Sequence, residues 1–432
     1  MEANWPMIAL LAFVTCIAAY IGRVWFKRWF NPLTIYSAVW GFCLVAYELR
    51  LIQYYDLSGR AWALIVAAWA SLYLGALLAV LFTAARNNVT VAPTDLKRMR
   101  LIIWVFTIVG AVGVVDEIFV LYRQFGSVFE AVFLNASDVY LARTDNALPY
   151  LPYVASAFYP AVSLAGCYAA ETGTFGIVCI APFFFMALHN LFSMGRAGLG
   201  VGALLFLFCY ACSPRKPISV RKKVLAGTVA LAILVGGFFA VSLTRSLQVD
   251  FPGRTDAIDT ISEYFPIFPS LYSNFSAPPV ALSTYLASPE KQGPWGAYTL
   301  APILRFISKF GFPVYVQPYE ENYYTPVPTN NNTYLKNIHS DFGLTGIVLF
   351  PFFLGIASVV LSLKAHGNLV PKLLFANLCV YVAFSVLYSV TVLGDWFIGL
   401  IVGIIAGAVI DRRSHFFESM TSPMGNPRTE MP

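Results

Sequence analysis

Long apolar runs recur along the whole chain and are separated by mostly short polar segments. Each run has about 18–22 residues, enough for an α-helix to cross a hydrocarbon core of about 30 Å. The pattern therefore predicts an all-α, polytopic integral membrane protein with about eleven transmembrane helices. They are expected near residues 5–22, 32–48, 61–84, 101–122, 150–170, 175–192, 197–212, 224–243, 342–363, 372–391 and 394–410.

The polar segment at residues 244–341 is the one long interruption in this pattern. It predicts a division into membrane helices 1–8 (1–243), one long extracytoplasmic, periplasmic loop (244–341), membrane helices 9–11 (342–413) and a cytoplasmic tail (414–432). Lys and Arg concentrate in the short loops after the odd-numbered helices, and such loops face the cytoplasm. We therefore expect an inner-membrane protein whose N-terminus lies outside, on the side of the long loop, and whose C-terminus lies in the cytoplasm.

Composition agrees with a membrane location, because 58% of the residues are apolar and only 12% are charged. The net charge of +6 does not indicate nucleic acid, since the basic residues lie mainly in inter-helix loops. All seven cysteines fall within apolar runs, so no disulfide is expected in the long loop. Walker, zinc-spacing, G-x-S-x-G and dinucleotide motifs are absent from the sequence, and no metal site is predicted.

Isolated arginines on the predicted outer side are the first candidates for chemistry. Guanidinium grips phosphate in a bidentate manner, so several of them around one cavity would suit a lipid pyrophosphate. The alternative is that each is a solvated or snorkelling surface arginine. Arg196 has the most specific context, because Gly195-Arg196-Ala197-Gly198 opens a predicted helix whose N-terminus favours an anion. The full set is Arg143, Arg196, Arg245, Arg254 and Arg305.

The segment before the predicted helix 342–363 holds a second group of candidates. His339 could accept a proton from a sugar hydroxyl near neutral pH, with Asp341 or Tyr334 orienting its ring. The alternative is a helix start in which Ser340 or Asp341 is the N-cap and His339 is incidental.

Other polar side chains could bind a sugar or share the arginine cavity. Asn332, Tyr323 and Tyr324 suit a carbohydrate, although an irregular loop with interfacial tyrosines would look the same. The adjacent acids Asp116 and Glu117 lie within an apolar run, where carboxylates are costly and indicate function. They could pair with an outer arginine or carry a proton or cation, and His189 and Asn190 are expected near Arg196.

Four segments, in order, resemble the bacterial oligosaccharide repeat-unit polymerases of the Wzy, or O-antigen polymerase, type. They are Gly195–Gly198, Glu263–Leu282, Trp295–Arg305 and Asn332–Gly346. The succession of helices around one long outer loop resembles that family too. The chain departs from the family pattern in having a single long outer loop where members often have two.

The resemblance implies a metal-independent, inverting glycosyltransferase without a cofactor. A glycan on undecaprenyl pyrophosphate would be transferred to a lipid-linked repeat unit at the outer face of the inner membrane, with membrane lipid and a chain-length-regulating co-polymerase as partners. Arg196, Arg245 and Arg305 would bind pyrophosphate, with Arg143 and Arg254 in second place, and His339 would be the base. The alternatives are an O-antigen ligase-type transferase and a polysaccharide-precursor transporter or flippase.

Overall fold

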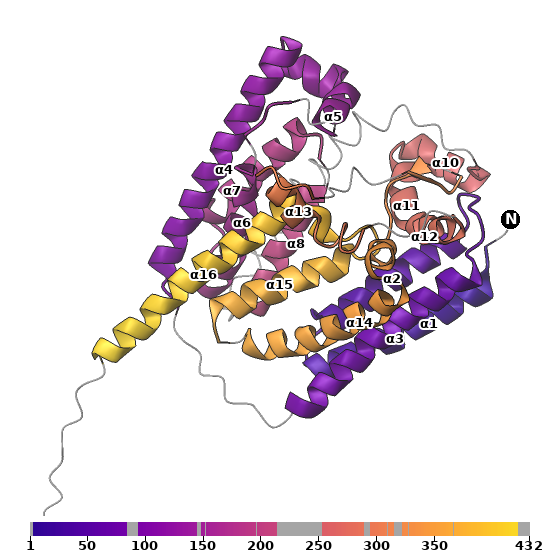
Figure 1. The fold of residues 1–432 in the computed structure, drawn as a ribbon, viewed down its shortest axis with the longest axis horizontal. Coiled ribbons are helices and arrows are strands. Elements are labelled where there is room, and N and C mark those ends of the chain that lie inside the picture. The colour runs from indigo at the N-terminus through magenta and orange to yellow at the C-terminus, as the bar shows by residue number, and fades with distance from the viewer. Residues whose placement is uncertain are drawn as a thin grey trace, which may run out of the picture.

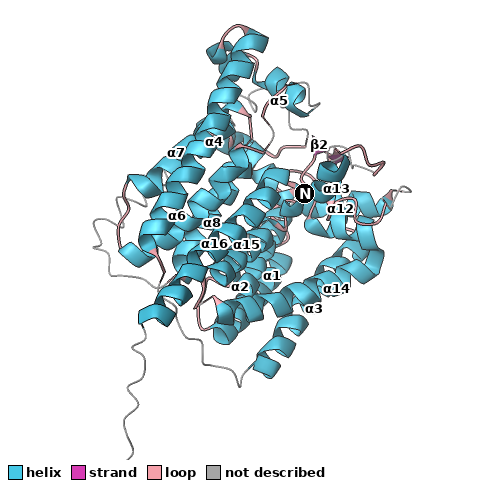
Figure 2. Cartoon of the chain, turned by 60° about the vertical axis from the view of Figure 1, so that its left-hand side comes forward, coloured by secondary structure: helices cyan, strands magenta, loops and turns pink. Residues whose placement is uncertain are grey.

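A computed structural model describes most of the chain and consists almost entirely of helices (Figures 1 and 2). The described residues are 3–83, 94–144, 148–151, 153–195, 197–213, 253–288, 294–308, 310–314, 322–326, 328–365 and 367–421. The two strands among them, β1 (Tyr323–Tyr324) and β2 (Pro328–Thr329), form one short antiparallel pair. The predicted all-α class is confirmed.

The longer helices coincide with the predicted apolar runs, apart from the run at 224–243, which lies outside the described residues. Five described helical stretches are long and apolar enough to cross a membrane: α1, α3, α4, α14 and residues 394–411 of α16. The longer helices are α1 (Trp5–Phe26), α2 (Pro32–Glu48), α3 (Gly59–Thr83), α4 (Leu96–Phe125), α6 (Phe158–Thr172), α7 (Ile177–Phe192), α8 (Ala197–Cys212), α14 (Tyr334–Lys364), α15 (Leu369–Phe384) and α16 (Gly394–Thr421).

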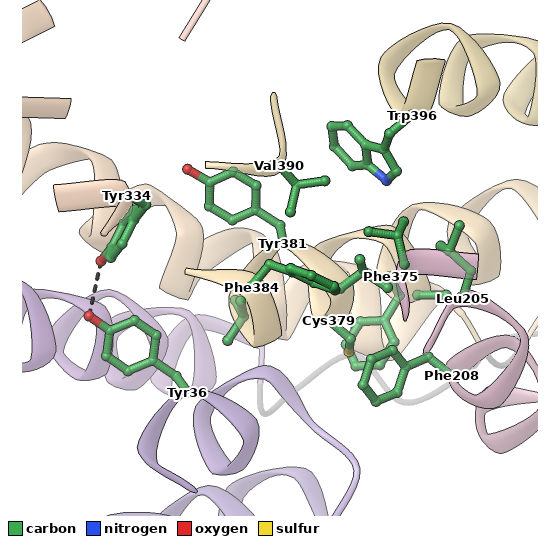
Figure 3. Packing of buried hydrophobic residues seen from close by; sticks show 14 of the residues in the cluster. Tyr36, Leu205, Phe208, Tyr334, Phe375, Cys379, Tyr381, Phe384, Val390 and Trp396 are labelled. Carbon is green, nitrogen blue, oxygen red and sulfur yellow. Dashed lines mark hydrogen bonds between the residues drawn. The ribbon is translucent and has the colours of Figure 1, made fainter. Parts of the chain in front are cut away.

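These helices pack in two groups that α15 joins (Figure 1). One group contains α1, α2, α3 and α14, and the other contains α4, α6, α7, α8 and α16. The hydroxyl groups of Tyr334 in α14 and Tyr36 in α2 form a hydrogen bond at 3.0 Å, and the ring of Tyr334 contacts that of Tyr381 in α15 (Figure 3). The aromatic side chains at this junction are buried, so α14 is held on both sides by apolar packing.

Shorter helices lie beyond one end of the long ones (Figures 1 and 2). The sequence 244–341 is therefore not a plain loop in its described parts, because it contains α10 to α13 and both strands. The shorter helices are η1 (Glu130–Leu134), α5 (Ala136–Thr144), η2 (Ala155–Ala157), α10 (Asp256–Tyr264), α11 (Phe268–Ser276), α12 (Pro278–Ala287), α13 (Ala301–Ser308) and η3 (Val390–Val392).

The α10–α12 segment is fixed to the connection between α2 and α3. Gln53 donates its backbone N–H to Gly253 at 2.8 Å, and the Tyr272 hydroxyl accepts the Leu51 N–H at 3.1 Å while donating to the carbonyl of Ala46. A separate small apolar core, which includes Ile52, forms under these contacts. The segment thus has a defined position on the ends of α2 and α3.

Helix α14 begins earlier than its apolar run predicts. It starts at Tyr334 with Thr333 in the N-cap position, so the alternative that made Ser340 or Asp341 the cap is wrong. Gly343 has φ of 62° and ψ of −153°, which breaks the helix into a polar first part and an apolar second part. The predicted helix 342–363 corresponds to the second part.

Two other predicted boundaries also differ. The predicted helix 150–170 begins as α6 only at Phe158, and the predicted helix 372–391 ends as α15 at Phe384. At that end the Ser385 carbonyl accepts the Tyr334 N–H at 2.8 Å, and the Ser385 hydroxyl accepts the Trp40 indole N–H at 3.0 Å. Contacts between distant segments therefore satisfy groups at both helix ends.

Candidate functional site

The first part of α14 contains three buried ionisable side chains. Lys336, His339 and Asp341 have exposed fractions of 1%, 4% and 5%. Burying charged groups is costly unless partners compensate them, and in membrane proteins such residues mark functional sites. Their partners come from α12, from the turn at 294–300 and from β1, so sequentially distant segments assemble this cluster.

Asp341 fixes the turn that precedes α13. Its two carboxylate oxygens accept the backbone N–H groups of Tyr298 at 3.0 Å and Thr299 at 2.7 Å. Charge-assisted hydrogen bonds of this kind are about twice as strong as neutral ones. Asp341 therefore holds the 294–300 turn against α14.

Lys336 lies among three tyrosine rings. Its Nζ donates to the Tyr298 hydroxyl at 2.7 Å and lies 3.9 Å from the centroid of that ring. The rings of Tyr285 and Tyr323 have their centroids 5.9 and 5.8 Å from the same Nζ. Cation–π attraction of this geometry is worth about 2 kcal/mol per desolvated contact, so the ammonium ties α12, the turn and β1 together.

Tyr285 also contacts the imidazole of His339. The Tyr285 hydroxyl and His339 Nδ1 are 3.1 Å apart, and the two rings meet edge to face. Sequence reasoning expected Asp341 or Tyr334 to orient this histidine, whereas the hydrogen bond shown comes from Tyr285 of α12. Tyr285 lies just beyond the Glu263–Leu282 segment, and no signal in the sequence connects it with His339.

The other predicted residues of this region have different surroundings. The Tyr334 hydroxyl is hydrogen-bonded to Tyr36 in the buried interface between α14 and α2. Asn332 is fully buried, and the side chain of its neighbour Asn331 donates to Asn274 of α11 at 2.8 Å. Tyr323 faces Lys336, whereas Tyr324 is 66% exposed. Of the proposed sugar-binding residues, Tyr323 therefore adjoins the cluster around His339 and Tyr324 faces outward.

A second polar cluster surrounds the junction between α7 and α8. Arg143 of α5 donates from Nη1 to the Ser193 carbonyl at 2.8 Å. Both Arg143 Nη1 and the Ser193 hydroxyl lie 3.3 Å from the point where a Cβ would sit on Gly195. Arg196 itself lies outside the described residues, but its neighbour Gly195 borders Arg143.

The acidic pair of α4 lies beside this junction. Glu117 Oε1 and His189 Nδ1 form a hydrogen bond at 2.7 Å. Asp116 accepts the Leu151 backbone N–H at 2.7 Å. The expected arginine partner is therefore replaced by His189 for Glu117 and by a backbone amide for Asp116. Asn190 lies at the junction of α7 and α8, where its side-chain oxygen accepts the Leu199 N–H at 3.2 Å.

The predicted arginines do not all gather at one point. Arg305 donates to the Val392 carbonyl at 3.5 Å, near Asp395 at the start of α16. Arg254 instead pairs with Asp259 at 2.8 Å beside the α2–α3 connection, and Arg245 lies outside the described residues.

The geometry thus gives two polar clusters, one around His339 at the head of α14 and one around Arg143 at the junction of α7 and α8. Among the described residues, no three His, Cys, Asp or Glu side chains are placed to hold a metal ion. Comparison with protein-family models, with curated proteins and with solved structures finds no match to this chain.

Proposed function

We propose that this protein is a membrane glycosyltransferase that joins lipid-diphosphate-linked oligosaccharide repeat units into a polysaccharide. The observation that carries the proposal is the buried cluster of Lys336, His339 and Asp341, assembled at the head of a long apolar helix. A bundle that only spans a membrane has no need to bury three ionisable groups there. Arg143 at the junction of α7 and α8 would supply the phosphate-binding group that such a reaction needs.

In the proposed reaction, the acceptor hydroxyl oxygen attacks the anomeric carbon of the donor glycan. The bond from that carbon to the lipid diphosphate breaks, the diphosphate leaves with the electron pair, and the imidazole of His339 takes the hydroxyl proton. Attack opposite the leaving group inverts the anomeric centre. Arg143, Arg196 and Arg305 would stabilise the charge that develops on the diphosphate.

The proposed topology places this chemistry at the outer face of a bacterial inner membrane. It has about eleven spans, a periplasmic N-terminus, a cytoplasmic C-terminus and a periplasmic segment at 244–341. The arrangement of α5 and α10–α13 beyond the same end of the long helices supports one common side for both clusters (Figure 1). Cysteine-accessibility labelling at residue 289 and at residue 425 should mark opposite faces of the membrane.

The decisive experiment uses the full chain in detergent with a lipid-diphosphate-linked repeat unit and no added metal. Products are separated on a gel and weighed by mass spectrometry for the wild type and for His339→Gln, Arg143→Gln and Arg254→Gln. We expect a ladder spaced by one repeat unit for the wild type and for Arg254→Gln, whose arginine pairs with Asp259 outside both clusters. His339→Gln and Arg143→Gln should lose the ladder while remaining folded.

The outcome also separates the alternatives. Transfer to a lipid A core but not to a second repeat unit would indicate a ligase. Intact substrate with a well-folded protein would reject glycosyl transfer for that substrate. Transport across proteoliposomes that is lost in Glu117→Gln would then favour a transporter, since the buried Glu117–His189 pair could carry a proton.

A further inference from the structure

The described residues of the 294–314 segment expose several large aromatic side chains. Phe306, Phe310 and Phe312 are 50%, 67% and 61% exposed, and Trp295 is 75% exposed. The rings of Phe306 and Phe310 meet edge to face with their centroids 5.0 Å apart, so they belong to one patch. An exposed apolar patch of this kind marks a surface that another molecule or a membrane covers.

Two contacts fix the level of this segment along the long helices. Arg305 Nη1 of α13 donates to the Val392 carbonyl of η3, two residues before α16 begins. The ring of Trp295 contacts that of Phe342, with centroids 5.2 Å apart, directly before the helix break at Gly343 and the apolar second part of α14. Helix α13 also contacts α16 (Figure 1). The segment therefore lies where two stretches that are long and apolar enough to cross a membrane begin.

The polar and apolar side chains of α13 separate around the helix. Ala301 is buried, and the guanidinium of Arg305 is bonded to η3. Ile303 and Phe306 are three positions apart and therefore share the exposed face, and the Phe310 N–H continues the helical turn by donating to the Ile307 carbonyl. Helices with an arginine on one face and aromatic side chains on the other lie in the plane of the membrane interface, where tryptophan is also enriched.

The surface of α14 that faces lipid begins beside this patch. Leu344, Val348 and Phe353 are exposed within the apolar second part of α14, so acyl chains cover them when the helix spans a membrane. Leu344 follows Phe342, which contacts Trp295, by two positions. A water-soluble partner would cover the patch alone, whereas a bilayer covers the patch and the side of α14 together.

We infer that α13 and the phenylalanines that follow it lie in the membrane interface, with their exposed side chains among the phospholipid acyl chains of that leaflet. The usual depth for such a helix is about 5–10 Å into the boundary between headgroups and acyl chains. The same segment carries the 294–300 turn that Asp341 holds, so the cluster around His339 lies close to the membrane surface. That this position serves a lipid-linked substrate rests on the proposed function, whereas the insertion of α13 does not.

The test measures how deeply single labelled positions lie in a bilayer. The full chain carries Cys16→Ser, which removes the exposed native cysteine and leaves the six buried ones. One new cysteine, Phe306→Cys or Phe310→Cys, is then labelled with the fluorophore NBD. The protein is placed in phosphatidylcholine nanodiscs that hold a single chain, with a nitroxide quencher either near the headgroup or near the end of the acyl chain.

Two controls use phenylalanine and tyrosine side chains that are equally exposed. Phe353→Cys marks the bilayer centre, because it lies ten helical residues, or about 15 Å, beyond Gly343 and the hydrocarbon core is about 30 Å thick. Tyr264→Cys marks water, because Tyr264 is 77% exposed in α10, which packs on α11.

We expect the labels at residues 306 and 310 to be quenched more strongly by the shallow nitroxide than by the deep one. The label at residue 353 should show the reverse order, and the label at residue 264 should be quenched by neither. The Tm of each labelled protein should equal that of the wild type, because the replaced side chains are exposed. Quenching at residues 306 and 310 that is no stronger than at residue 264 would overturn the insertion.

Single chains in one defined lipid also separate the other possible occupants of the patch. Blue-shifted emission without quenching would mean that another part of the chain covers it. A blue shift that requires two copies in one nanodisc would indicate an interface between copies, and one that requires added farnesyl diphosphate would indicate a site for an isoprenoid chain. Each of these three results would overturn the insertion. Because no substrate is present, a wild type that inserts α13 but makes no polymer would reject the proposed function alone.

Discussion

The contact between α3 and α14 gives the sharpest test of the fold, because two glycines allow the helix backbones to touch. A Cβ built on Gly75 of α3 would lie 2.0 Å from the carbonyl oxygen of Phe352 in α14. A Cβ built on Gly355 of α14 would lie 2.1 Å from the carbonyl oxygen of Leu72 in α3. Small residues of this kind let membrane helices approach closely and pack well.

The cost of Gly75→Ala or Gly355→Ala follows from these distances. Ordinary contact begins near 3.4 Å, so the helices would have to separate locally by about 1.4 Å. A gap of about 1 Å already forfeits a quarter to a half of each van der Waals contact, and overpacking alone costs about 1–3 kcal/mol. Because backbone atoms cannot rotate away, we expect a loss of about 3 kcal/mol for each variant.

The measurement is thermal or denaturant unfolding in detergent, with Gly59→Ala as the control. Gly59 begins α3, and a Cβ there would meet nothing within 4 Å, so that variant should be neutral or slightly stabilising. If Gly75→Ala and Gly355→Ala were as stable as Gly59→Ala, the backbones of α3 and α14 would not be in contact, and the derived packing would be refuted.

Three further predictions concern the polar clusters and the α11 contact. Asp341→Asn replaces one of two acceptor oxygens by a donor that faces a backbone N–H, so we expect a loss of about 3 kcal/mol in the free energy of unfolding and loss of polymer formation. Asp341→Glu keeps the charge and should therefore retain part of the stability and of the polymer formation. Equal losses in both variants would contradict this reasoning. Tyr285→Phe removes the hydrogen bond to His339 but keeps the aromatic ring. We therefore expect kcat to fall about tenfold or more and the pH–rate profile to shift, while KM changes little. An unchanged pH–rate profile would exclude a positioning role for Tyr285. Burial raises the pKa of Tyr272 from 10.0 to about 12, so as the pH rises the unfolded chain loses this proton before the folded protein does. The free energy of unfolding should therefore decline between pH 10 and 12 by at most about 2.7 kcal/mol. In Tyr272→Phe the free energy of unfolding should decline less steeply with pH, and equal slopes for the two proteins would exclude this linkage.

The helices could be predicted from the sequence because each depends on local composition. A membrane-spanning helix satisfies its own backbone hydrogen bonds, so a long apolar run is enough to specify it. The start of α14 did not follow this rule. Its first part, from Tyr334 to Phe342, is polar, and it is buried only because α12, the 294–300 turn and Ser385 satisfy its groups.

The sequence identified the segment that contains the candidate site, but not the contacts that its side chains make. His339, Asp341 and Tyr323 lie in or beside the buried cluster, whereas the roles of Lys336 and Tyr285 could not be anticipated. A lysine in a polar run is usually solvated, and the burial of Lys336 depends on three tyrosines from distant positions. Pairwise contacts of this kind leave no local pattern in a sequence.

The 294–308 segment connects the cluster around His339 with η3 and the start of α16, which predicts that Arg305 responds to changes in that cluster. Tyr298 at its beginning is held by Asp341 and Lys336, and Arg305 near its end reaches the Val392 carbonyl close to the start of α16. Releasing the turn from Asp341 should therefore also displace Arg305. If so, the effects of Asp341→Asn and Arg305→Gln on kcat/KM should not add. We expect the double variant to be little worse than Asp341→Asn alone, with a coupling energy of about 1 kcal/mol or more, whereas residues that do not share partners add to within about 0.5 kcal/mol. Strict additivity in this double-mutant cycle would mean that the turn does not transmit the position of α14 to Arg305, and Arg305 would then act independently of the cluster around His339.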